Sequence, residues 1–172
     1  MKTLYTQQDI EIETKILAKR ISDKHKGEKT PIVMVGLLNG CFMFYSDFVR
    51  NLTVDVECDF IRVKSYEGQF KQGDIKIIKD LETPIKGKHV YLVDDIYDTG
   101  TTMKTLIEYL EVKKPKSITL ATLVKRDTSP TPEVEAYHLF TVNKQDWLVG
   151  YGMDNEHGLL RNYPGILSLI HI

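Results

Sequence analysis

The sequence predicts an α/β domain in which a mostly parallel core sheet is flanked by helices. Two observations support this fold class. Residues 31–38 and 90–93 are short apolar runs rich in β-branched and aromatic residues, which is typical of strands buried on both faces of a parallel sheet. Each run is followed by a small polar loop and then by apolar residues at helical spacing. This repeated plan of strand, loop and helix indicates parallel strands joined by helical crossovers.

Length and composition fit a single domain, residues 1–172, that is long enough to bury a hydrophobic core. The chain has 23 Lys and Arg against 24 Asp and Glu, so no excess of charge attracts nucleic acid or a membrane surface. No run approaches the roughly 20 apolar residues of a membrane span, and the first residues lack the apolar centre of a signal peptide. We therefore expect a cytoplasmic protein with neither nucleic-acid nor membrane partners.

Cysteine and histidine usage predicts neither a disulfide framework nor a zinc site. Cys41 and Cys58 are the only cysteines, and both are expected to be small residues in apolar settings. The five histidines are scattered along the chain without the spacing of zinc ligands. They are His25, His89, His138, His157 and His171.

The N-terminal part of the chain predicts a capped helix and then a buried strand. Residues 6–9 read Thr-Gln-Gln-Asp and resemble a capping box. Ile10, Leu17 and Ile21 follow at helical spacing, and the helix is expected to end near residues 25–27. The buried strand at residues 31–38 comes next.

A second helix is predicted over residues 42–52, directly after Asn39 and Gly40. Asn-Gly by itself is most often a hairpin turn. The helical sequence after it favours instead a loop at the carboxyl end of a strand, where a second anion can bind. Residues 54–64 and 74–81 are then predicted as strands joined by a polar loop, which is either an exposed hairpin loop or a movable lid.

Residues 89–102 are the most informative stretch of the chain. They read His-Val-Tyr-Leu-Val-Asp-Asp-Ile-Tyr-Asp-Thr-Gly-Thr-Thr, and we interpret them as a strand ended by Asp94 and Asp95, a polar loop and a helix start. Ligands of open α/β sheets lie beyond the carboxyl ends of the strands. A loop of Thr and Gly at a helix start offers backbone N–H groups and the positive end of the helix dipole to a phosphate.

Acidic side chains beside this phosphate site indicate the kind of ligand. Asp94, Asp95 and Asp98 place negative charge next to an anion. This arrangement costs energy unless a cation neutralises the charge or sugar hydroxyls donate hydrogen bonds to it. A magnesium-bound phosphorylated sugar would supply both. The simpler interpretation treats the aspartates as helix caps and Asp-Thr-Gly as an ordinary turn; it explains each piece but not their combination.

The C-terminal half predicts one more core strand at residues 117–124, after Pro115 stops the preceding helix. Lys125 and Arg126 follow that strand and would point toward the ligand edge of the sheet. Residues 127–132 are predicted as a loop. Residues 147–154, Trp-Leu-Val-Gly-Tyr-Gly-Met-Asp, contain the single tryptophan, which is either core filler or part of a binding surface.

Four of these motifs, in this order, resemble those of the type I phosphoribosyltransferases that use 6-oxopurines. Residues 90–102 resemble the phosphoribosyl-pyrophosphate signature, and residues 38–40 the pyrophosphate loop with its cis peptide bond before Asn39. Ser65 and Tyr66 look like the pair that opens the flexible lid, which excludes water during reaction. Residues 147–154, preceded by Lys125 and followed by Arg161, resemble the purine-binding end. The resemblance spans residues 31–164 and implies the family's fold, with a small hood formed by the chain ends.

The resemblance implies purine salvage: hypoxanthine or guanine reacts with 5-phosphoribosyl 1-pyrophosphate to give IMP or GMP and pyrophosphate. Asp94 and Asp95 would hold the ribose hydroxyls and face Mg²⁺, and Asp154 would coordinate a second Mg²⁺. Asp98 would act as the general base near purine N7. The remaining contacts to the sugar donor would come from Leu38, Asn39, Gly40, Ser65, Tyr66, Thr99, Gly100, Thr101, Thr102 and Arg161.

At the purine, the resemblance implies that Trp147 stacks on the base and that backbone groups of Leu148 read its edge, with Asp154 nearby. Lys125 would donate to the 6-oxo oxygen. An ammonium group is a donor only, so adenine, which presents an amine at that position, would be disfavoured.

Three other interpretations compete with purine salvage. The enzyme could prefer xanthine or use a pyrimidine, or the chain could be a regulatory protein that kept the fold; retention of Asp98 and the balanced charge favour catalysis. A Rossmann-type nucleotide-binding module would need a Gly-x-Gly-x-x-Gly pattern after the first strand, and that pattern is absent. Homodimers or homotetramers are common in the family, so we expect one of these assemblies.

Overall fold

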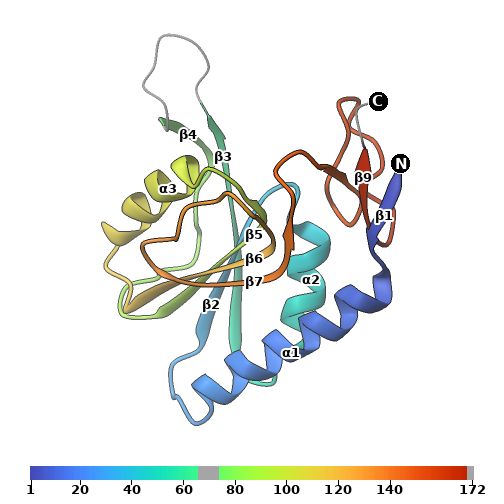
Figure 1. The fold of residues 1–172 in the computed structure, drawn as a ribbon. Helices are drawn as coiled ribbons and strands as arrows, with labels where there is room; N and C mark the ends of the chain where they lie inside the picture. The colour runs from blue at the N-terminus through green and yellow to red at the C-terminus, as the bar shows by residue number, and fades with distance from the viewer. Residues whose placement is uncertain (66–73, 170–172) are drawn as a thin grey trace.

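A six-stranded sheet forms the body of the protein in the computed structural model, which describes residues 1–65 and 74–169 (Figure 1). Its strand order is β4-β3-β2-β5-β6-β7, and all neighbours pair in parallel except β3 and β4. The strands are β2 (Ile32–Leu37), β3 (Val56–Ser65), β4 (Ile75–Lys79), β5 (His89–Tyr97), β6 (Ser117–Arg126) and β7 (Glu135–Val142). The predicted fold class, a mostly parallel core sheet flanked by helices, is therefore confirmed.

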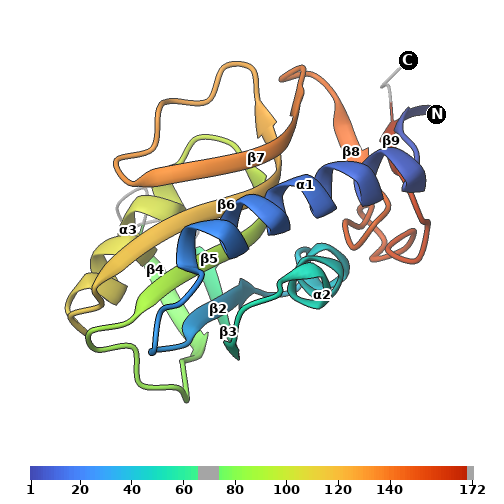
Figure 2. The same cartoon turned by 90° about the horizontal axis from the view of Figure 1, so that it is seen from below.

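Helices cover both faces of this sheet (Figure 2). One face packs against α1 (Gln7–His25) and α2 (Phe42–Asn51), and the other packs against α3 (Thr101–Glu111). Alternation along β5 supplies both cores: Tyr91 and Val93 face α1 and α2, whereas Val90 and Leu92 face α3. None of the helices in the described residues is long and apolar enough to cross a bilayer.

The predicted capping box begins α1. The Thr6 side chain accepts a hydrogen bond from the backbone N–H of Asp9, and the Asp9 carboxylate accepts one from the backbone N–H of Thr6. Two otherwise unpaired donors of the first turn are satisfied in this way. The helix then buries Ile10, Leu17 and Ile21, as its spacing predicts.

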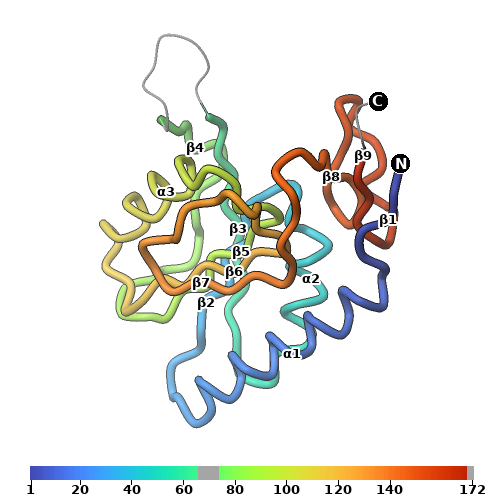
Figure 3. Tube along the Cα trace, viewed as in Figure 1, coloured from blue at the N-terminus to red at the C-terminus, as the bar shows by residue number. Residues whose placement is uncertain are grey.

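The two ends of the chain meet in a second, smaller sheet (Figure 3). It is antiparallel in the order β1-β9-β8, formed by β1 (Lys2–Tyr5), β9 (Ile166–Leu169) and β8 (Trp147–Val149). This sheet is the expected hood, and β8 brings Trp147 with it.

Several predicted boundaries and one predicted environment were wrong. β5 does not end before Asp94 but runs to Tyr97, because pairing with β6 continues through Asp94 opposite Thr122 and Ile96 opposite Val124. The helix α3 begins at Thr101, two residues before the first apolar residue of its predicted face. Strands β1, β7, β8 and β9 were not predicted. Cys41 is buried as expected, but Cys58 is exposed.

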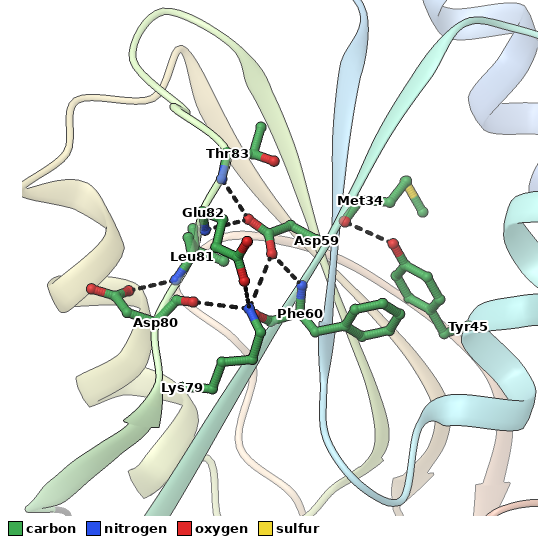
Figure 4. Close-up of polar contacts among 9 residues, drawn as sticks. All are labelled: Met34, Tyr45, Asp59, Phe60, Lys79, Asp80, Leu81, Glu82 and Thr83. Atoms are coloured by element: carbon green, nitrogen blue, oxygen red, sulfur yellow. Dashed lines mark hydrogen bonds and ion pairs between the residues drawn. The ribbon is translucent and has the colours of Figure 1, made fainter.

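Buried Asp59 in β3 anchors the connection between β4 and β5 (Figure 4). Its carboxylate accepts hydrogen bonds from the backbone N–H groups of Phe60, Glu82 and Thr83 at 2.7–2.8 Å, and Lys79 lies 3.5 Å away. Burial opposes ionisation of Asp59, but these donors outweigh it and hold the pKa of the carboxyl below its usual value. The network fixes the residues that lead into β5, the strand that carries the acidic pair.

Candidate active site

The site forms where β2 and β5, neighbours in the sheet, reach their carboxyl ends. The loop after β2 contains Leu38, Asn39 and Gly40, and the peptide bond between Leu38 and Asn39 is cis, as the resemblance implied. The backbone N–H of Leu38 donates to the carbonyl of Ile61 in β3 at 2.9 Å. The backbone carbonyl of Asn39 accepts a hydrogen bond from the backbone N–H of Phe42, the first residue of α2, at 3.1 Å. The loop is therefore held at both ends.

Gly40 lies between two other parts of the site. A Cβ atom added to Gly40 would lie 1.8 Å from Oδ2 of Asp95, and one added to Gly152 would lie 2.3 Å from the carbonyl oxygen of Gly40. Only glycine allows both close approaches. The predicted pyrophosphate loop therefore contacts both the acidic pair on β5 and the segment after β8 directly.

Asp94 and Asp95 form an electrostatically unfavourable pair. Burial, together with the charge of Asp95, raises the pKa of the Asp94 carboxyl well above its ordinary value. Each carboxylate also accepts the next backbone N–H, Asp95 donating to Asp94 and Ile96 to Asp95, both at 2.8 Å. Two carboxylates held this close favour a bound cation, because a positive charge removes their repulsion.

The loop predicted to bind the phosphate lies at the amino end of α3. Gly100 adopts the left-handed conformation with φ 76°, and a Cβ atom there would lie 2.5 Å from the hydroxyl of Tyr97. The N-cap residue, Gly100, supplies no side-chain cap, and only the N–H of Thr101 donates to a nearby side chain in the described residues, the hydroxyl of Thr99 at 3.4 Å. The positive dipole end of the helix therefore remains available to an anion. The hydroxyl of Thr101 donates to that of Thr99 at 3.2 Å, and Thr102 lies 3.3 Å from Ser65, oxygen to oxygen.

The loop also borders a cavity of about 380 Å³ between α3 and residues 130–134. Thr99, Gly100 and Thr101 are among its lining residues. Asp98 precedes them at the end of β5 and is exposed. The structure therefore places Asp98 beside the phosphate loop, with its carboxyl accessible to a substrate.

Asp154 and Arg161 form an ion pair at the far side of the site. Arg161 donates to Oδ2 of Asp154 and to the carbonyl of Gly152, both at 2.6 Å. Gly152 in turn donates its N–H to the carbonyl of Arg161 at 2.9 Å. Arg161 thus holds the segment that contacts Gly40, and its guanidinium lies next to the predicted magnesium ligand Asp154.

A second cavity of about 380 Å³ joins the acidic pair to the hood. It is lined by Asp95, Trp147, Leu148 and Asp154, together with Ile96, Arg126, Lys144, Gln145, Asp146 and Met153. Trp147 is 43% exposed, which contradicts the alternative that it fills the core. Leu148 is buried and pairs with Ser168 of β9. Three of the four predicted purine residues, Trp147, Leu148 and Asp154, therefore lie around one open cavity beside Asp95, whereas Lys125 does not line it.

Lys125 and Arg126 point in different directions, as consecutive residues of a strand must. Lys125 lines a separate cavity of about 220 Å³ with Tyr97 and His138. Buried Arg126 donates to the backbone carbonyls of Asn143 and Asp146 at 2.9 and 2.6 Å. Arg126 thereby holds the turn that precedes Trp147. Sequence reasoning missed this role, although the alternation of a strand already implies that only one member of the pair can face a given side.

One predicted part of the site lies outside the described residues. Ser65 is placed at the end of β3, beside Thr102. Tyr66 and residues 66–73 of the predicted lid are not described. The roles predicted for Lys125 and Leu148 at the purine remain predictions.

Together, the fold and the site define an α/β protein in which a helix start lies next to an acidic pair, the surroundings that suit a phosphate and a cation. A family model described as the phosphoribosyl transferase domain matches residues 1–156. The chain belongs to this phosphoribosyltransferase family, and its similarity to relatives named as phosphoribosyltransferases identifies it as an enzyme.

Individual relatives and solved structures indicate which members of the family this chain is similar to. A hypoxanthine-guanine phosphoribosyltransferase of Aquifex aeolicus is 41% identical over 96% of this chain and 93% of its own. A hypoxanthine phosphoribosyltransferase structure from Staphylococcus aureus superposes with a TM-score of 0.90 at 34% identity, covering 98% of this chain and 91% of its own. A hypoxanthine-guanine phosphoribosyltransferase from Bacillus anthracis, with HEPES in its active site, gives a TM-score of 0.91 at 32% identity and 99% coverage of both chains.

Proposed function

We propose that this enzyme transfers the phosphoribosyl group of 5-phosphoribosyl 1-pyrophosphate to N9 of hypoxanthine, guanine or both. The products are IMP or GMP and pyrophosphate, and the reaction salvages free purine bases. The observation that carries the proposal is the meeting of Gly40, Asp95 and Gly152 at one point. That contact joins the pyrophosphate loop, the acidic pair and the segment after β8, whose Met153 and Asp154 line the purine cavity, into a single continuous site. Similar proteins named for this activity support the same conclusion.

Binding of the sugar donor follows from the groups at the carboxyl edge of β5. The N–H groups at the start of α3 and the hydroxyls of Thr99, Thr101 and Thr102 suit the 5′-phosphate. Asp94 and Asp95 can accept hydrogen bonds from the ribose hydroxyls. The loop through Gly40 can donate backbone N–H groups to the pyrophosphate, and Arg161 can add its positive charge.

The acidic residues fit Mg²⁺ as the cofactor. Burial and the charge of Asp95 oppose ionisation of Asp94, and a divalent cation would reverse this preference. Asp94, Asp95 and Asp154 supply the oxygen ligands that Mg²⁺ prefers. When bound, the ion would neutralise charge on the pyrophosphate as it leaves.

Chemistry at C1 of the ribose requires that positive charge be stabilised and that a proton be removed from the purine. Loss of pyrophosphate builds positive charge on the ribose ring, as in glycoside cleavage, and the nearby carboxylates stabilise that charge. The Asp98 carboxylate then accepts the purine proton as N9 attacks. Trp147 stacks on the base, and Lys125 donates to its 6-oxo oxygen, which disfavours adenine.

One steady-state assay tests the proposal. The enzyme is supplied with 5-phosphoribosyl 1-pyrophosphate, Mg²⁺ and, in turn, hypoxanthine, guanine, xanthine, adenine, uracil or orotate. We expect turnover with hypoxanthine or guanine and at most trace turnover with adenine and the pyrimidines. A preference for xanthine would change the assigned substrate, and no turnover with any base would favour a regulatory protein instead.

A further inference from the structure

Two histidines and a glutamate meet at the edge of the sheet opposite the active site. His25 is the last residue of α1, Glu28 lies in the turn that follows, and His89 is the first residue of β5. Each offers one ligand atom, and the three atoms lie within 4.8 Å of one another. The cluster is five residues along β5 from Asp94, roughly 16 Å at the rise of an extended strand. It is therefore separate from the acidic pair.

We propose that His25, Glu28 and His89 form a binding site for a divalent transition-metal ion such as Zn²⁺. Oε1 of Glu28 lies 3.4 Å from Nδ1 of His25 and 3.5 Å from Nε2 of His89. Ligand atoms bound to one tetrahedral zinc ion at its usual bond lengths lie about 3.3 Å apart. Two of the three distances between ligand atoms are therefore already close to the value that a tetrahedral zinc ion requires.

The buried His25 ring provides independent support for a ligand. The residue is only 3% exposed, yet its Nδ1 has no hydrogen-bond partner within the described residues. A buried polar atom without a partner costs free energy, and a metal ion would satisfy it. His25 also ends a 19-residue helix, whose negative dipole end favours a nearby cation.

The other nitrogen of each ring is already held by a hydroxyl group. Nε2 of His25 lies 2.6 Å from the hydroxyl of Tyr91, and Nδ1 of His89 lies 2.6 Å from that of Ser117. Metal-binding histidines almost always have such a partner, which fixes the ring and leaves the opposite nitrogen for the metal. Both rings thus direct their remaining nitrogen toward Glu28.

Charge and access suit a metal ion better than an ion pair alone. The neighbouring Lys24 is itself paired with Glu135 at 2.6 Å. His25 and Glu28 also line a cavity of about 240 Å³ through which solvent reaches the cluster.

The ligand set predicts which metal binds and what binding does. Two imidazoles and one carboxylate suit Zn²⁺, Cu²⁺, Ni²⁺ or Co²⁺, whereas Mg²⁺ prefers oxygen ligands alone. With three protein ligands, a tetrahedral ion would keep one position for water. Binding would join the end of α1 at His25 to the start of β5 at His89, 64 positions later in the sequence, and would raise the melting temperature.

Zinc titration of the untagged protein, after removal of metals with a chelator, tests the proposal. We expect one Zn²⁺ per chain by calorimetry, with a rise in melting temperature that 10 mM Mg²⁺ does not produce. Glu28→Gln and His89→Ala should each weaken binding at least tenfold. Ser117→Ala should weaken it about 10- to 100-fold, as removal of a hydrogen-bond partner of a metal-binding histidine typically does.

A matched control comes from His157, which forms an exposed pair with Glu156 at 3.4 Å but lies outside the cluster. His157→Ala should leave the tight zinc site unchanged. Circular dichroism would establish that every variant is folded, and anomalous diffraction from a zinc-soaked crystal should place the ion at His25, Glu28 and His89. The proposal is overturned if the wild type binds no stoichiometric zinc, if Glu28→Gln and His89→Ala bind as the wild type does, or if the ion lies elsewhere.

Discussion

Replacement of Gly40 by alanine tests whether the contact between the pyrophosphate loop and the acidic pair determines activity. Gly40 does not have a positive φ, so alanine fits its backbone. The new Cβ atom would lie 1.8 Å from Oδ2 of Asp95, whereas ordinary contact begins at 3.4 Å. The carboxylate of Asp95 must therefore move by about 1.6 Å, because the loop is hydrogen-bonded on both sides.

A displacement of this size is costly at a group that holds the reacting sugar, the role that we propose for Asp95. Misplacement by about 1 Å can lower a rate roughly 100-fold, which corresponds to about 2.7 kcal/mol of transition-state stabilisation. We expect Gly40→Ala to lower kcat/KM for the sugar donor by at least that factor, with a melting temperature close to that of the wild type. Initial-rate kinetics over a range of donor concentrations provide the measurement.

A double-mutant cycle with Asp95→Ala isolates the cause. If alanine at residue 40 acts by displacing Asp95, the double variant should be no slower than Asp95→Ala alone. If the double variant instead loses the product of the two single-variant fold losses in kcat/KM, Gly40→Ala acts elsewhere. Activity of Gly40→Ala within threefold of the wild type would refute the reasoning, because the close contact would then have no functional consequence.

Four further predictions concern other parts of the protein. Asp98→Asn should lower kcat by at least about 100-fold, the effect expected when a general base is removed. Calorimetry should still detect binding of the sugar donor. Near-normal turnover would exclude Asp98 as the base. Lys125→Ala should weaken use of hypoxanthine or relax discrimination against adenine, and unchanged base kinetics would remove Lys125 from the purine site. IMP should change the fluorescence of Trp147, the single tryptophan, whereas constant emission at saturating IMP would argue against stacking. Asp59→Asn should lower the free energy of unfolding by about 1–3 kcal/mol at pH 7, since buried donors lose a charged acceptor. The pKa of Asp59 is depressed by folding, so its contribution is present above the unfolded pKa near 3.9 and disappears as pH falls through the folded pKa. Denaturant unfolding of both proteins from pH 7 to pH 2.5 should show the difference shrinking below about pH 4, and a constant difference would contradict this account.

Local patterns predicted the elements on which the site is built. The apolar runs that became β2 and β5 are buried on both faces, so composition alone identifies them. The capping box at Thr6 and the helical spacing after Thr102 are also local signals. These elements carry the acidic pair, the pyrophosphate loop and the phosphate loop, which explains why the candidate site was found from sequence.

Features that depend on contacts between residues far apart in the sequence could not be predicted from local patterns. β1 and β9 pair across almost the whole chain, and each is too short to be recognised without its partner. β5 extends past Asp94 because β6 continues to pair with it, which no pattern within residues 89–102 reveals. Arg126 beneath the turn at residues 143–146 and the cluster of His25 with His89 are likewise products of the fold.

The most direct test of the central claim is a crystal structure with 5-phosphoribosyl 1-pyrophosphate and Mg²⁺ bound. The account predicts the 5′-phosphate on residues 98–102, the ribose hydroxyls at Asp94 and Asp95, and the pyrophosphate against residues 38–40. A sugar donor bound at another surface, with this edge of the sheet empty, would contradict it.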